Sequence, residues 1–391
     1  MENSDRPIRV TIVQPALAKY RIPVFRELAR RPGIALRVVY GAVANLPNAE
    51  PDGFVAVPSY RWEGRIGPAA MFHGAEWTEC SRRRADVVVL RWSPRSLSLA
   101  PGLLRARMNG VATVLWGHGY SKSERRWWIN SRNWLARRAD ALVFYDPRTR
   151  EKYVRDGWDP RRLFVAINCL DHEEIVAARQ WWEDRPHELA DFRRQQGLDS
   201  GPTVLFVSRL QPANRVDLLI LALAELVQEI PSLKIAIIGS GSEEKQRLTR
   251  LAAEVAPPGS VIFSEGIYDE RRLAAWFLSA DVFCYPQNVG LSLIHALWYG
   301  LPVVTSDNLA SQNPEVVALE HGVNGLLYEH GNVASLASAI RQIIMDKSLA
   351  ESMSAAARSV VENRFTIAKM VDGLEAAIRF AHRSVVGRQP A

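Results

Sequence analysis

Short apolar runs that alternate with longer amphipathic segments most strongly limit what this 391-residue chain can fold into. They form two series, separated by a polar stretch at 171–200. Strands that lack polar alternation are covered on both faces, and strand–helix alternation is typical of parallel sheets. The predicted strands are 10–13, 36–40, 87–90, 113–116, 142–145 and 164–167 in the first series, and 204–207, 235–238, 261–263, 282–285, 303–305 and 326–328 in the second.

The two series predict an α/β protein with two doubly wound, Rossmann-like domains and a cleft between them, because one core rarely grows to this length. We place the N-terminal domain at 1–170, a connector at 171–200 and the C-terminal domain at 201–365. Helical spacing continues from Leu349 to Phe380, and a helix at about 366–391 can pack back on the first domain. Ligands of such sheets lie at the carboxyl ends of the strands.

The composition favours a cytoplasmic protein, located free or at the inner face of a membrane. The chain has no apolar run of the length that a transmembrane helix needs, and it opens on polar residues rather than on a signal peptide. Its three cysteines, Cys80, Cys169 and Cys284, form no C-x-x-C pair, so we expect them to be small buried hydrophobic residues.

Positive charge is concentrated in the first half. Residues 1–170 hold 29 Lys and Arg against 15 Asp and Glu, a net charge of +14, whereas 171–391 hold 20 against 27, a net −7. Such asymmetry indicates a partner surface on the first half. Nucleic acid, an anionic membrane and an anionic acceptor are the candidates.

Two arginines in the second half follow a predicted strand. Arg209 stands at the end of that strand and Arg215 near the start of the next helix. Guanidinium groups suit a diphosphate because they bind bidentately and stay charged. The alternative is a pair of ordinary surface arginines.

Two further loops of the second half contain glycines after strands. Gly239-Ser240-Gly241 allows close approach of the backbone to a ligand, and Gly266-Ile267-Tyr268 can hold a nucleobase edge. An ordinary turn and a loop with a surface tyrosine remain the alternatives.

The segment 285–305 is the most specific of these signals. It reads as a strand, a glycine turn, a helix that begins near Gly290, a Gly-Leu-Pro break and another strand. A helix start carries free N–H groups and the positive end of the helix dipole, so a phosphate is its natural ligand.

These segments resemble the retaining family 4 glycosyltransferases of the GT-B architecture, of the type that builds bacterial surface glycans. The resemblance is firm from about 203 to 330. Arg209 matches the arginine of the G-R-L-x-x-x-K-G motif, while Asn214 stands where lysine is usual. In the E-x7-E region, Gln287 and His295 take the places of the two glutamates, which usually bind sugar and ribose hydroxyls respectively.

The resemblance implies a donor site for a UDP- or GDP-sugar and a catalytic role for Arg209, Arg215 and His118. The implied donor-binding residues are Ser208, Asn214, Gly239, Ser240, Gly241, Gly266, Ile267, Tyr268, Gln287, Asn288, Val289, Gly290, Leu291, Ser292 and His295.

The acceptor is expected on the first half. Lys19, Tyr20 and Arg21 follow the first strand, in a Y-R-x-P-x-F pattern found in enzymes of surface glycans. His118 lies between two glycines at the end of the fourth strand, and Tyr120 and Lys122 follow it. The resemblance assigns a histidine of this region to the donor sugar and implies a glycan or lipid-linked glycan as acceptor.

A tryptophan- and arginine-rich stretch runs from Lys122 to Arg138. As a helix it places Trp127, Trp128, Trp134 and Leu135 on one face, away from most of its arginines. One interpretation packs the tryptophans on the sheet and leaves the arginines in solvent. The other is an interfacial helix that contacts anionic lipid.

The predicted reaction is glycosyl transfer in polysaccharide synthesis with retention at the anomeric carbon. Cationic side chains and a helix start neutralise the leaving phosphate. The sequence contains no D-x-D, and we expect neither a metal nor a cofactor. The alternatives are a nucleotide-sugar 2-epimerase of the same architecture and a nucleic-acid-binding protein that uses the basic half, although no nucleic-acid-binding motif occurs.

Overall fold

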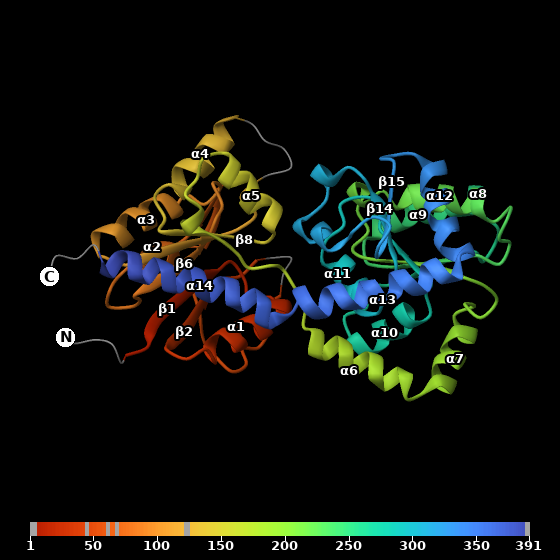
Figure 1. The fold of residues 1–391 in the computed structure, drawn as a ribbon, viewed down its shortest axis with the longest axis horizontal. Helices are drawn as coiled ribbons and strands as arrows, with labels where there is room; N and C mark the ends of the chain where they lie inside the picture. Colours follow the sequence, from red (N-terminus) through yellow and green to blue (C-terminus); the bar gives the residue numbers. More distant parts are fainter. Residues whose placement is uncertain (1–5, 44–46, 60–62, 67–69, 121–125, 388–391) are drawn as a thin grey trace. The chain divides into compact units, whose positions relative to one another are not determined.

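The computed structural model describes residues 6–43, 47–59, 63–66, 70–120 and 126–387. The chain divides into two compact units, of which the first comprises Met1–Asn168 with Ile367–Ala391 and the second Cys169–Thr366. Each unit has its own parallel sheet with helices packed on it (Figure 1). The prediction of two Rossmann-like α/β domains is therefore confirmed.

The main sheet of the first unit has, within the described residues, seven parallel strands in the order β3-β2-β1-β6-β7-β8-β9. Their bounds are β1 Ile8–Gln14, β2 Ile34–Tyr40, β3 Val55–Pro58, β6 Val87–Arg91, β7 Ala112–Trp116, β8 Ala141–Phe144 and β9 Leu163–Val165. β7 and β8 are buried at every residue, as expected for strands covered on both faces. β4 (Glu63–Ile66) and β5 (Ala70–His73) form a separate antiparallel pair.

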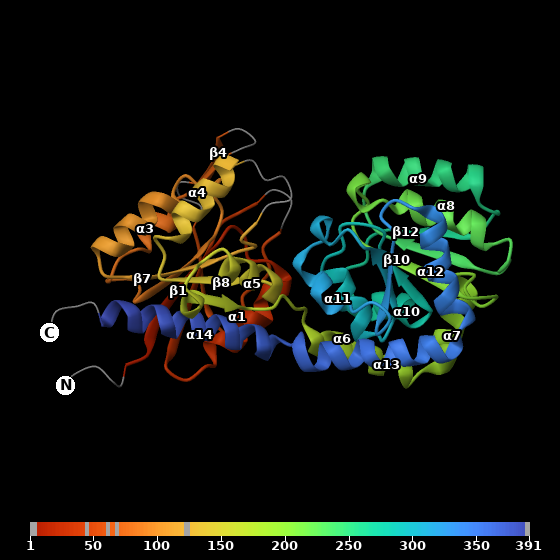
Figure 2. The ribbon, with the colours of Figure 1, turned by 45° about the horizontal axis from the view of Figure 1, so that its top comes forward.

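The helices of the first unit include one from the far end of the chain. They are α1 Ile22–Ala29, α2 Ala75–Thr78, α3 Leu99–Met108, α4 Arg126–Ala136, α5 Pro147–Arg155 and α14 Ile367–Val386. α14 packs against α1 and against strands β6 to β9 (Figures 1 and 2). A Cβ atom on Gly373 would lie 1.8 Å from the carbonyl oxygen of Val165, so glycine is what permits this close approach.

The sheet of the second unit has, in the described part of the chain, six parallel strands in the order β12-β11-β10-β13-β14-β15. Their bounds are β10 Thr203–Val207, β11 Lys234–Ile238, β12 Val261–Ser264, β13 Val282–Cys284, β14 Val303–Ser306 and β15 Gly325–Tyr328. The helices are α6 His172–Glu183, α7 Pro186–Gln195, α8 Val216–Leu226, α9 Ser242–Val255, α10 Glu270–Leu278, α11 Leu291–Trp298, α12 Val333–Met345 and α13 Lys347–Arg364. The order of strands reverses between β10 and β13.

Differences from the sequence prediction have local causes. β3 was not predicted although its residues, Val55–Pro58, are apolar, and at the edge of the sheet none of them is buried. The helical pattern at the C-terminal end is two helices, α13 and α14, separated by Phe365 and Thr366, where the chain passes from the second unit to the first. The pattern continues across this break because each helix buries one face within its own unit.

Two expectations from composition can be compared with the structure. Cys80, Cys169 and Cys284 are all buried, and burial raises the pKa of Cys80 to about 12. Among the helices of the described ranges, none has the length and hydropathy that crossing a bilayer requires.

Candidate functional site

The loops after β10 and β13 flank the reversal of strand order, the position where open α/β sheets bind their ligands. Residues 208–215 form the first loop and 285–290 the second. Their backbones meet directly, because the N–H of Gln287 donates to the carbonyl oxygen of Asn214 at 3.2 Å. Gln287 itself is half-buried. The structure therefore brings together two of the predicted donor-binding segments at one edge of the second sheet.

The side chain of Asn214 stabilises the contact between the loops 208–215 and 285–290, which we call the junction. It is 2% exposed, its Nδ2 donates to the carbonyl oxygen of Arg209 (2.8 Å), and its Oδ1 accepts from Nδ2 of Asn288 (3.0 Å). The carbonyl oxygen of Asn288 accepts in turn from Nδ2 of Asn313 (3.0 Å). Both ends of the Asn214 amide are engaged within the protein, so this position, where the family motif has lysine, ties the two loops together.

Two residues of the junction have a left-handed backbone. Arg215 has a φ of 54° and Asn288 a φ of 68°, and within the described residues they are the non-glycine positions with positive φ. This conformation costs an L-residue roughly 1–2 kcal/mol, and asparagine tolerates it best. Arg215 occupies the last position of the motif G-R-L-x-x-x-K-G, where glycine avoids the cost. Backbone strain that is concentrated where the strand order reverses indicates a functional site.

Three guanidinium groups lie around the junction. Arg209 is exposed and forms no ion pair with another described residue. Arg215 donates to Asp217 from Nε and Nη2 at 3.1 Å, and these hydrogen bonds raise the pKa of Arg215. Arg247 on α9 approaches the same carboxylate (3.9 Å) and pairs with Glu244 (2.7 Å). Sequence reasoning missed Arg247 because no motif marks its position.

Glycines let the loop after β11 pack on the loop after β10, and the loop after β12 pack on the loop after β11. A Cβ atom on Gly239 would lie 1.9 Å from the carbonyl oxygen of Ser208, and one on Gly241 would lie 2.5 Å from that of Leu210. A Cβ atom on Gly266 would lie 2.4 Å from Oγ of Ser240. Packing against backbone carbonyls is enough to require glycine at 239 and 241, which supports the structural alternative for these two residues.

The remaining residues of these loops differ in exposure. Oγ of Ser208 accepts a hydrogen bond from the hydroxyl of Tyr285 (3.0 Å), and burial raises the pKa of Tyr285. Ile267 is half-buried. Tyr268 is 82% exposed, as the alternative of a surface tyrosine predicts.

α11 begins at Leu291 with Gly290 as its N-cap, which is where a helix was predicted. The start of a helix has N–H groups without intrahelical partners and a partial positive charge. Leu291 and Ser292 are half-buried there. Val289 is fully buried, and its N–H donates to Oε1 of Gln312 (2.7 Å). The helix start therefore has the polarity that an anion needs, whereas Val289 serves the fold.

His295 forms a polar group with two residues that the sequence did not single out. Its Nε2 lies 2.8 Å from Oε1 of Glu270, the first residue of α10, and the hydroxyl of Tyr299 donates to the same oxygen at 2.6 Å. The side chains of His295 and Glu270 are each 13% exposed. A carboxylate is thus present beside His295, although it comes from a different helix and no spacing in the sequence reveals it.

In the first unit the segment 117–119 follows β7. A Cβ atom on Gly117 would lie 2.9 Å from Cβ of Trp92, and one on Gly119, where φ is 69°, would lie 2.7 Å from the ring of Phe144. The two glycines let the loop lie against these aromatic residues. His118, between them, is exposed.

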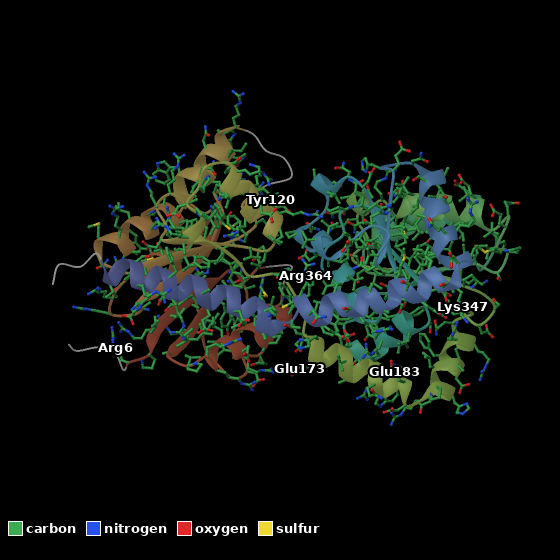
Figure 3. The ribbon with its side chains drawn as sticks, in the orientation of Figure 1. Arg6, Tyr120, Glu173, Glu183, Lys347 and Arg364 are labelled. Atoms are coloured by element: carbon green, nitrogen blue, oxygen red, sulfur yellow. The ribbon has the colours of Figure 1, made fainter. Side chains whose placement is uncertain are left out.

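Tyr145, directly after β8, contacts two of the residues that the sequence predicted for the site, His118 and Arg21. Its ring centroid is 4.8 Å from that of His118, which is 6.0 Å from that of Tyr120 (labelled in Figure 3). The hydroxyl of Tyr145 accepts from Nη2 of Arg21 (3.1 Å). Arg21 is 6% exposed and its guanidinium lies 4.5 Å from the ring centroid of Trp116. The expectation that Arg21 faces a ligand is therefore not met, because its guanidinium is buried under aromatic rings.

The other predicted acceptor residues are dispersed. Lys19 and Tyr20 are exposed next to the buried Arg21. Lys122 lies outside the described residues. Of the five residues predicted to bind the acceptor, Arg21 and Tyr120 lie in the neighbourhood of His118.

A cavity of about 410 Å³ opens beside His118 and Tyr120. Its walls come from the segments after β6 and β7, from Tyr145 and from α4. The sequence did not predict this cavity, because its residues are contributed by four separate segments.

The tryptophans of α4 do not all pack on the sheet, as one of the two interpretations of the sequence required. Trp127 and Trp134 are 54% and 47% exposed, whereas Arg132 is 6% exposed. Leu135 is buried and Trp128 is half-buried. The interpretation that packs the tryptophans on the sheet and leaves the arginines in solvent is wrong for Trp127 and Trp134, which are exposed, and for Arg132, which is buried and lines the cavity.

Residues 189–360 match the family model described as Glycosyl transferases group 1. This segment is similar to the group 1 glycosyl transferases. It contains all the predicted donor-binding residues. The resemblance predicted from the sequence is thereby confirmed for this segment. No group of three or more His, Cys, Asp or Glu side chains arranged to hold a metal ion is found in the described ranges.

The curated relatives include two kinds of glycosyltransferase. The chain is 31% identical over 230 residues to the GDP-mannose-dependent alpha-(1-6)-phosphatidylinositol monomannoside mannosyltransferase of Mycolicibacterium smegmatis, across 56% of this chain and 57% of that protein. It is 31% identical over 198 residues to the D-inositol 3-phosphate glycosyltransferase of Frankia alni, across 48% of this chain and 45% of that protein. The chain thus matches about half the length of these relatives.

Among solved structures, the fold is similar to that of the Anabaena protein HepE in complex with UDP. The TM-score is 0.73 at 16% sequence identity, and the match covers 95% of this chain and 100% of the HepE chain. A similarity at this identity concerns the fold. It agrees with the two parallel-sheet units described above.

Proposed function

We propose that the protein is a retaining glycosyltransferase that moves a sugar from a UDP- or GDP-sugar to a glycan or lipid-linked glycan acceptor in bacterial polysaccharide synthesis. The main support is the junction at the strand-order reversal of the second unit. There Arg209 and Arg215 belong to the loop that meets the loop leading into α11, through the hydrogen bond between Asn214 and Gln287. Both loops lie within residues 189–360, the segment that matches the family model. A nucleoside diphosphate is the ligand that two guanidinium groups and a helix start suit best.

Transfer breaks the bond between the anomeric carbon and the oxygen of the β-phosphate. The acceptor oxygen forms its new bond on the same face of the sugar, and the acceptor proton passes to the leaving phosphate. The negative charge that develops on that phosphate is stabilised by Arg209, Arg215 and the N–H groups at Leu291. Cationic groups of the protein then carry the role that a metal ion has in other glycosyltransferases, so the proposed reaction needs no metal or cofactor.

The nucleotide ribose is proposed to bind at Glu270 and His295. His295 replaces the glutamate of the family motif, and Oε1 of Glu270 lies 2.8 Å from its Nε2. A carboxylate accepts hydrogen bonds from hydroxyl groups and a histidine ring can donate one. The pair therefore supplies what a single glutamate supplies in the family motif, from two helices instead of one.

His118 is proposed to contact the transferred sugar, because it is exposed on a loop that its flanking glycines hold against the sheet. Lys19, Tyr20 and Tyr120 are exposed or half-buried in the same unit and are proposed to contact the acceptor. Arg21 then acts indirectly, by holding the ring of Tyr145.

The first unit is proposed to contact an anionic membrane through α4, at the inner face of the membrane. The exposed Trp127 and Trp134 and the exposed Arg126, Arg137 and Arg138 are the residue types that membrane interfaces favour. The net charge of +14 in residues 1–170 supports the same assignment.

The test is a thermal-shift and turnover screen of the full-length protein over UDP-, GDP-, ADP- and dTDP-sugars. We expect one nucleotide to stabilise the protein and its sugar to be hydrolysed slowly without acceptor and transferred with one. Anomeric proton coupling in the product reports retention, and turnover must persist in EDTA. An epimerised donor in the reaction without acceptor would instead establish the nucleotide-sugar 2-epimerase, and inversion or loss of turnover in EDTA would refute the proposed chemistry.

A further inference from the structure

Arg215 and Asp217 form an ion pair at the start of α8. Arg215 is the N-cap of this helix, and Asp217 lies in its first turn. Nε of Arg215 donates to Oδ1 of Asp217 (3.1 Å), and Nη2 donates to Oδ2 (3.1 Å). The side chain of Asp217 is 17% exposed, whereas that of Arg215 is 40% exposed. A two-point contact of this kind fixes the plane of a guanidinium group as well as its position.

The carboxylate of Asp217 is directed at Arg215 and not at the backbone of α8. In the described part of the chain it accepts hydrogen bonds from Arg215 and from no backbone N–H. Arg247 approaches it to 3.9 Å, but Nε and Nη2 of Arg247 donate to Glu244 at 2.9 and 2.7 Å. The helix dipole favours any acidic residue in the first turn and does not require this side-chain pairing. Asp217 is therefore available to orient Arg215.

The guanidinium of Arg215 has a second edge, which Asp217 does not use. Among the described residues, Nη1 of Arg215 has no hydrogen-bond partner. Nη1 and the remaining N–H of Nη2 lie side by side on this edge and form a fork that matches two oxygens of a phosphate. An arginine held at one edge by a carboxylate can thus present the other edge to a phosphate.

Tyr328, the last residue of β15, connects this ion pair with the junction. Its hydroxyl donates to the carbonyl oxygen of Pro286, in the loop that leads into α11 (3.0 Å). Burial raises the pKa of Tyr328, and the charges of Arg215 and Asp217 act on it with opposite signs. The ion pair therefore lies within electrostatic range of a side chain that touches this loop.

We infer that Asp217 is a positioning residue, which holds one edge of the Arg215 guanidinium so that the other edge faces the leaving phosphate. The inference rests on the proposed function, which places Arg215 at that phosphate. A group that is oriented in advance stabilises the charge of the transition state without reorganisation. Because Asp217 also cancels part of the positive charge, it should contribute to turnover and little to the binding of the donor.

The test is the steady-state kinetics of Asp217→Asn in the full-length protein, with the sugar nucleotide that the donor screen selects. We expect kcat to fall by roughly tenfold. The donor KM and the affinity for UDP or GDP should change by less than about twofold, because losing the orientation and losing a negative charge oppose each other. Glu229→Gln, which breaks the ion pair with Arg341 just beyond the end of α8, is the matched control and should keep wild-type kinetics.

A double-mutant cycle separates positioning of Arg215 from a general effect on α8. Arg215→Gly removes the guanidinium and adopts the φ of 54° without strain, so Asp217→Asn should cause no further fall of kcat in this background. Asp217→Glu keeps the charge but moves the carboxylate by one methylene group, and it serves in the same cycle if Asp217→Asn fails to fold.

The outcomes distinguish the inference from the proposed function. Effects on kcat that add in the cycle, or a folded Asp217→Asn with the kcat of the control, would overturn the inference, and normal nucleotide binding in the same proteins would leave the proposed function standing. A wild-type protein that binds neither UDP nor GDP would refute the proposed function and the inference with it.

Discussion

Oε1 of Glu270 lies 2.8 Å from Nε2 of His295, so that the first residue of α10 and a residue of α11 form one polar group. His295 stands at the position where the family motif has its second glutamate. The carboxylate beside His295 therefore comes from a neighbouring helix. The ribose-binding role proposed for this pair has a direct test.

Replacing Glu270 with Gln removes the charge but keeps the shape of the side chain. We expect the donor KM to rise by roughly tenfold, because a charge-assisted hydrogen bond to a ribose hydroxyl is lost. A 2′-deoxyribose donor serves as the matched substrate. The wild-type protein should discriminate between the two donors and Glu270→Gln should not, and an equal loss on both would place the ribose elsewhere.

Arg209→Ala should lower kcat by roughly 10²–10³-fold, because one preorganised positive group is removed from the leaving phosphate. Arg250→Ala, an exposed arginine on α9, is the control and should keep full activity. Turnover is measured at saturating donor so that binding and chemistry are separated. Activity of Arg209→Ala close to that of the control would remove Arg209 from the mechanism.

Arg215 combines a left-handed backbone with a charged side chain, and two substitutions separate these properties. Arg215→Gly and Arg215→Ala both lose the guanidinium, so turnover should fall equally in both. Only glycine adopts the φ of 54° without strain, so Arg215→Gly should be more stable than Arg215→Ala by about 1 kcal/mol. Urea unfolding measures this difference. Equal stability would mean that the backbone at this position relaxes in the alanine variant.

Trp127→Ala and Trp134→Ala should each weaken binding to vesicles of phosphatidylglycerol by roughly tenfold, because half-exposed indole rings lose their contact with the interface. Binding of the wild-type protein should also fall with added salt, since the charge of this unit attracts the lipid. Tyr268→Ala, which removes a still more exposed aromatic residue of the second unit, is the control. Vesicle binding that is unaffected by both tryptophan variants would leave α4 without a membrane role.

The ion pair of Asp86 with Arg9 (2.9 Å) predicts an acid-sensitive contribution to the stability of the first unit. Burial raises the pKa of Asp86, but hydrogen bonds from Arg9 outweigh it and hold the pKa below its ordinary value of 3.8. A carboxyl group with a lowered pKa stabilises the fold above its ordinary pKa and loses this effect as the pH falls through its native pKa. Asp86→Asn should therefore be less stable than the wild-type protein at pH 7, and the difference should shrink below pH 3.8. A difference that is constant with pH would exclude this linkage.

The fold could be predicted from the sequence because the buried strands have no polar alternation, which makes them visible as runs. β3 is also an apolar run, but it is only four residues long, ends in a proline, and lies at the sheet edge with its residues partly or fully exposed. The start of α11 at Leu291 was predicted because Gly290 marks the end of the preceding loop. For the buried strands and the start of α11, the residues of the segment itself were sufficient for the prediction.

The site residues that escaped prediction act over long separations. Glu270 reaches His295 across 25 positions, and Arg247 meets Asp217 from another helix. In α4 the apolar pattern is right for the buried Leu135 but wrong for Trp127 and Trp134, which are exposed, while Arg132 is buried beside the cavity. A pattern of hydrophobicity predicts the inner face of a helix only when that face packs on apolar residues.

Helix α14 follows the whole second unit in the chain but belongs to the first unit, where Gly373 meets the backbone of Val165. During synthesis residues 367–386 must therefore leave the ribosome before α14 can cover its part of the sheet that ends at β9. The second unit, Cys169–Thr366, does not have to wait for this helix to complete its core. A nascent chain stalled near residue 366 would carry an exposed apolar sheet, a state that chaperones recognise.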